Sequence, residues 1–275
     1  MTTSTAPSAG PAQTRGRPRA PAMSSARRTS LVAGVFYLLT FVSLPTLLLY
    51  RSALKTDYLS SAGSDTPVLV GTILEVVVAL AGIGTAITLF PVVRRQNEAM
   101  ALGFVASRTL EAAMLFTAVA SIRALVSLRQ DITAGTAGDP SSSAATAAAH
   151  VADYEWAFTL GGSLMPAINA LLLGTLLYRS GLVPRALPAL GLLGVPFHLT
   201  AVLLTMLGAV DRVGVVTGLA AIPIALWELS LGIYLVTRGF KPSPVLVADP
   251  PPSPPLPPAS PPAAFGPTLE AHPVA

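Results

Sequence analysis

Six long apolar runs, separated by short polar segments, occupy the middle of the chain. They cover residues 31–50, 68–90, 101–122, 156–178, 186–208 and 215–237. Each run is long enough to cross a bilayer, because a hydrocarbon core of about 30 Å takes about 20 helical residues. The pattern predicts an all-α integral membrane protein, built as a bundle of six transmembrane helices.

Two segments without apolar periodicity flank these runs. Residues 1–28 are mostly Thr, Ser, Ala, Pro and Arg, and residues 242–275 are rich in Pro. We expect both to be disordered tails around a transmembrane domain of residues 29–241. Met23 is an alternative start. The first run is expected to be a retained anchor, since it exceeds the roughly 7–15 apolar residues of a signal peptide.

The longest connection, residues 127–155, consists largely of Ala, Ser, Thr and Gly. This composition favours a mobile linker over a folded segment, with a helical run before Trp156 as the alternative. Tyr50, Tyr154, Trp156 and Tyr178 lie near the ends of the apolar runs, where aromatic side chains commonly anchor a helix at the membrane surface.

Composition supports a membrane location and excludes several kinds of chemistry. Of the 275 residues, 52% are hydrophobic and 11% are charged, against about 25% charged in soluble domains. The net charge of +4 comes from basic residues spread beside the apolar runs, so we expect the lipid bilayer as partner and no nucleic acid. The absence of cysteine removes disulfides, thiolate metal sites and Cys nucleophiles.

Sequence motifs of known catalytic sites are also missing. The chain has no Walker loop, no HExxH and no GxSxG motif, so we predict a non-enzymatic protein without cofactor or metal. A homo-oligomer is compatible with six helices. The "PPSPPLPP" stretch of the tail could bind a cytoplasmic partner that reads Pro-rich sequences, although a solvated tail is the favoured interpretation.

Lys and Arg are distributed unequally between alternate connections. If the N-terminus is inside, eleven lie on the inside, namely Arg15, Arg17, Arg19, Arg27, Arg28, Arg94, Arg95, Arg179, Arg185, Arg238 and Lys241. Five lie outside: Arg51, Lys55, Arg123, Arg129 and Arg212. Cytoplasmic loops carry the excess of positive charge. Together with an Ala-, Gly-, Pro- and Arg-rich composition, this predicts the bacterial plasma membrane, with both termini in the cytoplasm.

Four ionisable side chains fall inside the apolar runs: Glu75, Arg108, Glu111 and Glu228. A charge at the bilayer centre costs about 2.5–3.5 kcal/mol, so each must face the bundle, be paired, or be neutral. Arg108 and Glu111 are three residues apart and therefore share a helix face. Because one guanidinium neutralises one carboxylate, we expect at least one of the three glutamates to carry a proton near neutral pH.

Depth along each helix predicts which of these groups can meet. At about 1.5 Å per residue from the cytoplasmic end, Arg108 lies roughly 10 Å deep, and Glu228, Glu111 and Asn169 lie roughly 14–15 Å deep. His198 falls at roughly 18 Å in the same layer, whereas Glu75 lies apart at roughly 22 Å. His198 is more typical of a hydrogen-bonded core histidine than of a metal ligand.

Three interpretations of this polar layer are open. The favoured one is a structural clasp, in which the buried ion pair and hydrogen bonds fix the register of the helices. The alternative is a small proton-coupled transporter in which Glu111 and Glu228 exchange protons, because ionisable residues inside a membrane are candidates for function. An intramembrane enzyme is the third, and no activating pair of residues supports it.

Three stretches resemble a bacterial membrane family known as domain of unknown function 4386. They are "LFPVVRRQNEAMALGFVASRTLE" (89–111), "LLYRSGLVPRALPALGLLGVP" (176–196) and "IPIALWELSLGIYLVTRGFKPSP" (222–244). The resemblance covers roughly residues 29–244 and implies a multi-pass membrane protein without an assigned activity. The Pro-rich tail departs from the family pattern. The matching positions are Asn97, Glu98, Arg108, Glu111, Arg179, Pro184, Trp227 and Glu228.

Overall fold

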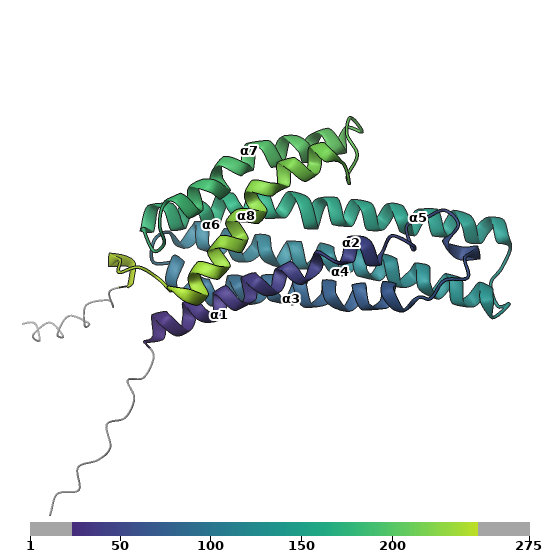
Figure 1. Cartoon of the computed structure of the whole chain (residues 1–275), viewed down its shortest axis with the longest axis horizontal. Coiled ribbons are helices and arrows are strands. Elements are labelled where there is room, and N and C mark those ends of the chain that lie inside the picture. Colours follow the sequence, from purple (N-terminus) through teal and green to yellow (C-terminus); the bar gives the residue numbers. More distant parts are fainter. Residues whose placement is uncertain (1–23, 247–275) are drawn as a thin grey trace, which may run out of the picture.

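Six helical segments long and apolar enough to cross a membrane run through the computed structural model, which describes residues 24–246 (Figure 1). They are Ser25–Leu49, Thr66–Val93, Glu98–Thr133, Pro140–Ser180, Ala186–Met206 and Val215–Thr237. Residues 24–246 contain no β-strand. The predicted all-α bundle of six spans is therefore confirmed, whereas most of both predicted tails lies outside the described residues.

The first segment is a broken helix. Helix α1 (Ser25–Thr40) passes into a 3₁₀ turn, η1 (Phe41–Ser43), and resumes after Pro45 as the short helix α2 (Thr46–Leu49). Proline lacks a backbone N–H and crowds the preceding turn, which accounts for an interruption at this point. Because α1 begins at the end of the bundle where α8 (Val215–Thr237) finishes, we call that end proximal and the other distal.

Helices α3 (Thr66–Val93) and α4 (Glu98–Thr133) form an antiparallel pair joined by a tight proximal turn. The side chain of Asn97 caps α4 by accepting a hydrogen bond of 2.9 Å from the N–H of Met100. Helix α4 has 36 residues and so measures about 54 Å at 1.5 Å per residue, well beyond a hydrocarbon core of about 30 Å. One of its ends must therefore project from the membrane.

The next segment is one continuous helix with a π-helical turn inside it. Helix α5 (Pro140–Phe158) leads through η3 (Thr159–Leu164) into α6 (Met165–Ser180). The prediction of a mobile linker over 127–155 is wrong, because α4 continues to Thr133 and α5 starts at Pro140. The carboxylate of Asp139 caps α5 by accepting from the N–H groups of Ser141 and Ser142. In Figure 1 the distal parts of α4 and α5 run side by side past the tip of the α7–α8 hairpin.

A buried ion pair fixes the distal part of this assembly. Arg129 on α4 contacts Asp65, with 2.5 Å between Nη1 and Oδ1, and also donates to the carbonyl oxygens of Ser61 and Gly63. The hydroxyl of Tyr58 donates to the same Asp65 oxygen at 2.8 Å. Burial raises the pKa of Tyr58 to about 12, so this hydroxyl stays protonated to a higher pH than an exposed tyrosine.

Two of the four expected membrane-surface aromatics are instead buried in the distal core. Tyr50 and Tyr154 are almost inaccessible, and their rings meet edge to face with 5.6 Å between centroids. The expectation of surface anchors is thus wrong for these two. Trp156 and Tyr178 are 50% and 43% exposed, consistent with the anchoring role that Trp and Tyr take at membrane surfaces.

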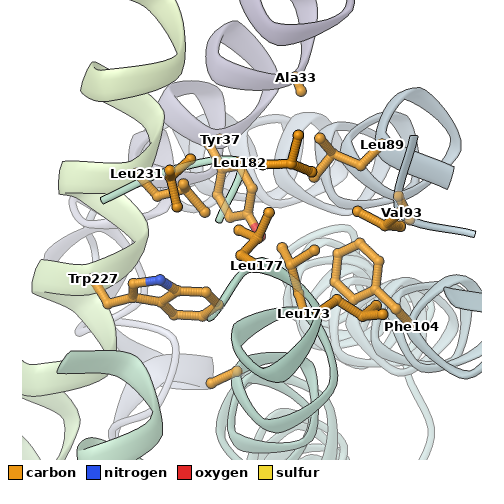
Figure 2. Close-up of a cluster of buried hydrophobic side chains, with 14 of the residues drawn as sticks. Ala33, Tyr37, Leu89, Val93, Phe104, Leu173, Leu177, Leu182, Trp227 and Leu231 are labelled. Atoms are coloured by element: carbon orange, nitrogen blue, oxygen red, sulfur yellow. The ribbon is translucent and has the colours of Figure 1, made fainter. Parts of the chain in front are cut away.

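The proximal core contains side chains from all six transmembrane segments, including Val195 of α7. Figure 2 shows Tyr37 of α1, Leu89 of α3, Phe104 of α4, Leu177 of α6 and Trp227 of α8 gathered in one cluster. Helix α7 (Ala186–Met206) packs against α8 and α6. The start of the Pro-rich segment also contacts this end, since the hydroxyl of Ser243 donates to Ser180 O at 2.8 Å and η4 (Pro244–Leu246) packs on the cluster.

Helices α1 and α8 approach closely at a pair of glycines. A Cβ atom on Gly34 would lie 2.8 Å from Gly232 O and from Val236 on the facing helix. Arg27 strengthens the same contact by donating to the terminal carbonyls of α8, Leu235 O at 2.9 Å and Val236 O at 2.5 Å. The first and last spans can therefore pack this closely because position 34 has no side chain.

We expect Gly34→Ala to lower the free energy of unfolding by about 1–3 kcal/mol, the usual cost of overpacking. The measurement is thermal unfolding of the purified protein in detergent. Gly218→Ala on α8 is the control, because a Cβ there meets nothing within 4 Å; it should be neutral or slightly stabilising. Equal stability of the Gly34→Ala variant and the parent would contradict the close contact.

Candidate functional site

Arg108 lies in the middle of the bundle, 2% exposed, and is bound by two carboxylates. Its Nη1 donates to both oxygens of Glu111, at 3.2 and 3.0 Å, and its Nη2 donates to Glu228 Oε1 at 2.6 Å. Glu111 follows on the next turn of the same helix, as the three-residue spacing predicts, whereas Glu228 comes from α8. Charge-assisted bonds of this kind are among the stronger polar contacts in proteins.

Asn169 adds helix α6 to this group. Its Nδ2 donates to Glu111 Oε2 at 2.6 Å, so the predicted meeting of Arg108, Glu111, Asn169 and Glu228 is observed. We call these four residues the clasp. The guanidinium also lies 5.5 Å from the ring centroid of Tyr37 on α1, a favourable cation–π distance. Side chains from four helices thus contact one buried charge or its partner.

Small residues allow the helix backbones to come close enough for these contacts. A Cβ on Gly161, in the π-helical turn, would lie 2.6 Å from the Cβ of Met114 and 3.3 Å from the carbonyl oxygen of Glu111. Only a glycine lets this turn lie directly against α4. Gly82 of α3 likewise faces the Arg108 side chain. The geometry of the clasp therefore depends on glycines of neighbouring helices as well as on its charges.

Glu75 makes no hydrogen bond to the clasp, as expected from its different predicted depth. It is 1% exposed, and its Oε2 accepts from the hydroxyl of Tyr50 at 2.8 Å. The Tyr50 ring occupies the space where a side chain on Gly71 would be, 2.5 Å from the position of a Cβ. Among residues 24–246, Glu75 Oε1 has no hydrogen-bond partner. A buried carboxylate oxygen without a partner is costly.

Glu75 and the three charged residues of the clasp line one cavity of about 200 Å³, which we call the clasp cavity. Besides Glu75, Arg108, Glu111 and Glu228, its walls include the hydroxyl-bearing Thr40 and Ser43 and the ring of Phe158. The broken part of α1 forms one wall, and the π-helical turn forms another through Gly162. Helix irregularities of these two kinds often occur at functional sites.

His198 does not join the clasp. Its ring Nε2 bonds to the carbonyl oxygen of Ser163 at 2.9 Å, so it is a hydrogen-bonded core histidine as favoured from the sequence. The sequence places His198 in the same layer as the clasp, but its ring bonds to Ser163 and not to a clasp residue. It lines a different cavity, together with Arg212.

Sequence reasoning missed three residues of these sites: Tyr37, Tyr50 and Arg212. Tyr37 has apolar neighbours and gives no signal except its hydroxyl group, and the position of Tyr50 at the end of an apolar run indicates a surface anchor instead. Arg212 lies in a turn between two spans and looks like an ordinary loop arginine. For α5 a signal did exist, since Asp139 before Pro140 is a typical N-cap followed by a first-turn proline.

The fold and the clasp define a class of protein: a multi-pass membrane protein whose polar residues are gathered inside a bundle of apolar helices. Residues 32–239 match the family described as "Domain of unknown function (DUF4386)". The chain belongs to this family, as its resemblance to the family pattern predicted. No curated protein and no solved structure matches the chain.

We expect Arg108→Gln to lower the free energy of unfolding by about 3–5 kcal/mol, because it leaves two buried carboxylates without their cation. Glu111→Gln and Glu228→Gln should each lose less than this, since one carboxylate still faces the guanidinium. Thermal unfolding in detergent measures all three. Arg123→Gln, an exposed arginine on the same helix, is the control and should match the parent. An Arg108→Gln variant as stable as the parent would overturn the clasp.

Proposed function

We propose that this membrane protein works without covalent catalysis, and that the clasp is structural. The observation that carries this proposal is the pairing of Arg108 with Glu111 on its own helix and with Glu228 on α8. Both carboxylates are engaged with the guanidinium, and Glu111 also accepts from Asn169. Polar groups that satisfy one another in this way fix helix positions. The absence of recognisable catalytic motifs agrees with this proposal.

Proton-coupled transport is the second candidate function, and one observation favours it. Glu75 lines the clasp cavity with an oxygen that has no partner among the described residues. We therefore propose Glu75 as the proton-exchanging group, in place of Glu111 and Glu228, which are held by Arg108. A carboxylate kept at a stability cost inside a membrane is a candidate for function. The cavity supplies a space in which a small solute could bind beside it.

Glu75→Gln is expected to be at least as stable as the parent, because an amide oxygen can still accept from Tyr50 and no charge is buried. Infrared difference spectra between acid and alkaline buffers contain the bands of all titrating carboxyls, so the spectrum of Glu75→Gln is subtracted from that of the parent. The remainder should contain a protonated-carboxyl band. The same subtraction with Glu228→Gln is the matched control and should leave no such band. The absence of a remaining band for Glu75→Gln, or a strong loss of stability there, would contradict Glu75 as the proton carrier.

We also propose that the protein lies in a bacterial plasma membrane with both termini in the cytoplasm. The excess of Lys and Arg in proximal connections supports this orientation. An even number of spans, with α1 beginning and α8 ending at the proximal end (Figure 1), agrees with it.

Fusions of alkaline phosphatase to the connections test the orientation, because this enzyme is active only outside the cytoplasm. We expect activity for fusions within the distal segments 134–139 and 207–214. Fusions within the proximal turns 94–97 and 181–185 should be inactive. The reverse pattern of activity would show that the termini lie outside.

A further inference from the structure

A second cavity, of about 250 Å³, lies between the π-helical turn, α7 and the start of α8. We call it the α8 cavity. It shares Phe158 and Gly162 with the clasp cavity and is therefore its neighbour. Most of its walls are apolar, including Leu47, Val202 and Ala221. The α8 cavity is lined by a cation and by no carboxylate, whereas the clasp cavity is lined by both.

Arg212 supplies this cation. Its guanidinium lies against the rings of Tyr154 and Phe158, 5.3 and 5.4 Å from their centroids. Its Nη2 is 3.8 Å from Glu155, a distant contact to a half-exposed carboxylate. Nε and Nη1 are buried and have no hydrogen-bond partner among residues 24–246. A guanidinium held by two rings with free N–H groups is preorganised to bind an anion.

The first turn of α8 contributes at the same place. Gly214, Thr217 and Gly218 line the cavity. The Thr217 hydroxyl accepts from the N–H of Gly214 at 3.0 Å, whereas no side chain of residues 24–246 accepts from the N–H groups of Val215 or Val216. The unpaired N–H groups of a helix N-terminus carry partial positive charge and commonly bind phosphate. Helix α8 has 23 residues, so the partial positive charge at its N-terminus is fully developed.

His198 provides an independent sign that a ligand belongs here. It is 8% exposed and lines the α8 cavity. With Nε2 engaged by Ser163 O, its buried Nδ1 has no partner among the described residues. Buried polar atoms are normally hydrogen-bonded. We take this unpaired ring nitrogen, on a residue that lines the same cavity as Arg212, as a sign of a polar ligand.

We propose that the α8 cavity binds the phosphate group of an anionic lipid. Arg212 and the first N–H groups of α8 contact the phosphate, His198 contacts a hydroxyl of the headgroup, and the apolar walls hold part of an acyl chain. Residues 207–214 join two membrane-spanning helices, which places Arg212 near the level of lipid headgroups. Free phosphate shares the headgroup chemistry, but it would leave the apolar walls unused. This proposal is independent of any proton exchange by Glu75.

The test is thermal unfolding of the full-length protein in neutral detergent with added phosphatidylglycerol, phosphatidylcholine or inorganic phosphate. We expect only phosphatidylglycerol to raise the unfolding midpoint. Arg212→Gln should weaken the apparent affinity about tenfold or more, because it removes a charge-assisted contact to the phosphate. Arg51→Gln, which removes an exposed charge from the same end of the bundle, should leave the affinity unchanged.

A second variant tests the cavity without changing any charge. A Cβ on Gly218 meets nothing within 4 Å, so Gly218→Leu should fold, fill the cavity and abolish the lipid effect. Gly218→Ala leaves most of the space free and should retain it. Equal stabilisation by both lipids, an effect of Arg51→Gln as large as that of Arg212→Gln, or lipid binding by Gly218→Leu would each overturn the proposal. A similar shift with inorganic phosphate would instead assign the site to free phosphate.

Discussion

Arginine keeps its proton in any protein environment, so the bundle must neutralise the charge of Arg108 where it lies. Lipid headgroups cannot reach this charge inside the bundle, so its counter-ions must come from its own helix or from neighbouring helices. The guanidinium is bound by Glu228 on α8 and by Glu111 on α4. Asn169 on α6 donates to Glu111, and the ring of Tyr37 on α1 lies over the guanidinium. The helix arrangement is consequently determined as much by one charge as by apolar packing.

Several polar groups in and around the two cavities are not fully satisfied. In the clasp, both carboxylates contact the guanidinium, but Arg108 Nε and Asn169 Oδ1 have no partner among residues 24–246. Glu75, Arg212 and His198 also each retain a buried atom without a partner there. Such atoms are rare in a low-dielectric interior, because each lowers stability. Both cavities include Phe158 and Gly162 in their walls. Polar groups that can bind a ligand therefore lie near the π-helical turn.

The sequence was sufficient to predict the six spans and the composition of the clasp. Apolar run length fixes the spans, and counting residues from a helix end places Arg108, Glu111, Asn169 and Glu228 at similar depth. The depth of a residue does not say which neighbouring helix its side chain faces, so depth alone also groups His198 with these four residues. The break after α1 follows from Pro45, but the contact between Tyr50 and Glu75 depends on tertiary packing. The small side chains of α5 suggest mobility and so favour a linker, although Ala is also the best helix former.

The continuous helix from Pro140 to Ser180 connects the distal core to the proximal core, to both of which α3 and α4 also contribute. Tyr154 lies in the distal core on this helix, and Asn169, which donates to Glu111, lies further along the same backbone. A hydrogen-bonded helix is stiff, and the π-helical turn, residues 159–164, is the irregular segment between these two residues. A rotation of the distal part of α5 would therefore either change the geometry of this turn or move Asn169 against Glu111.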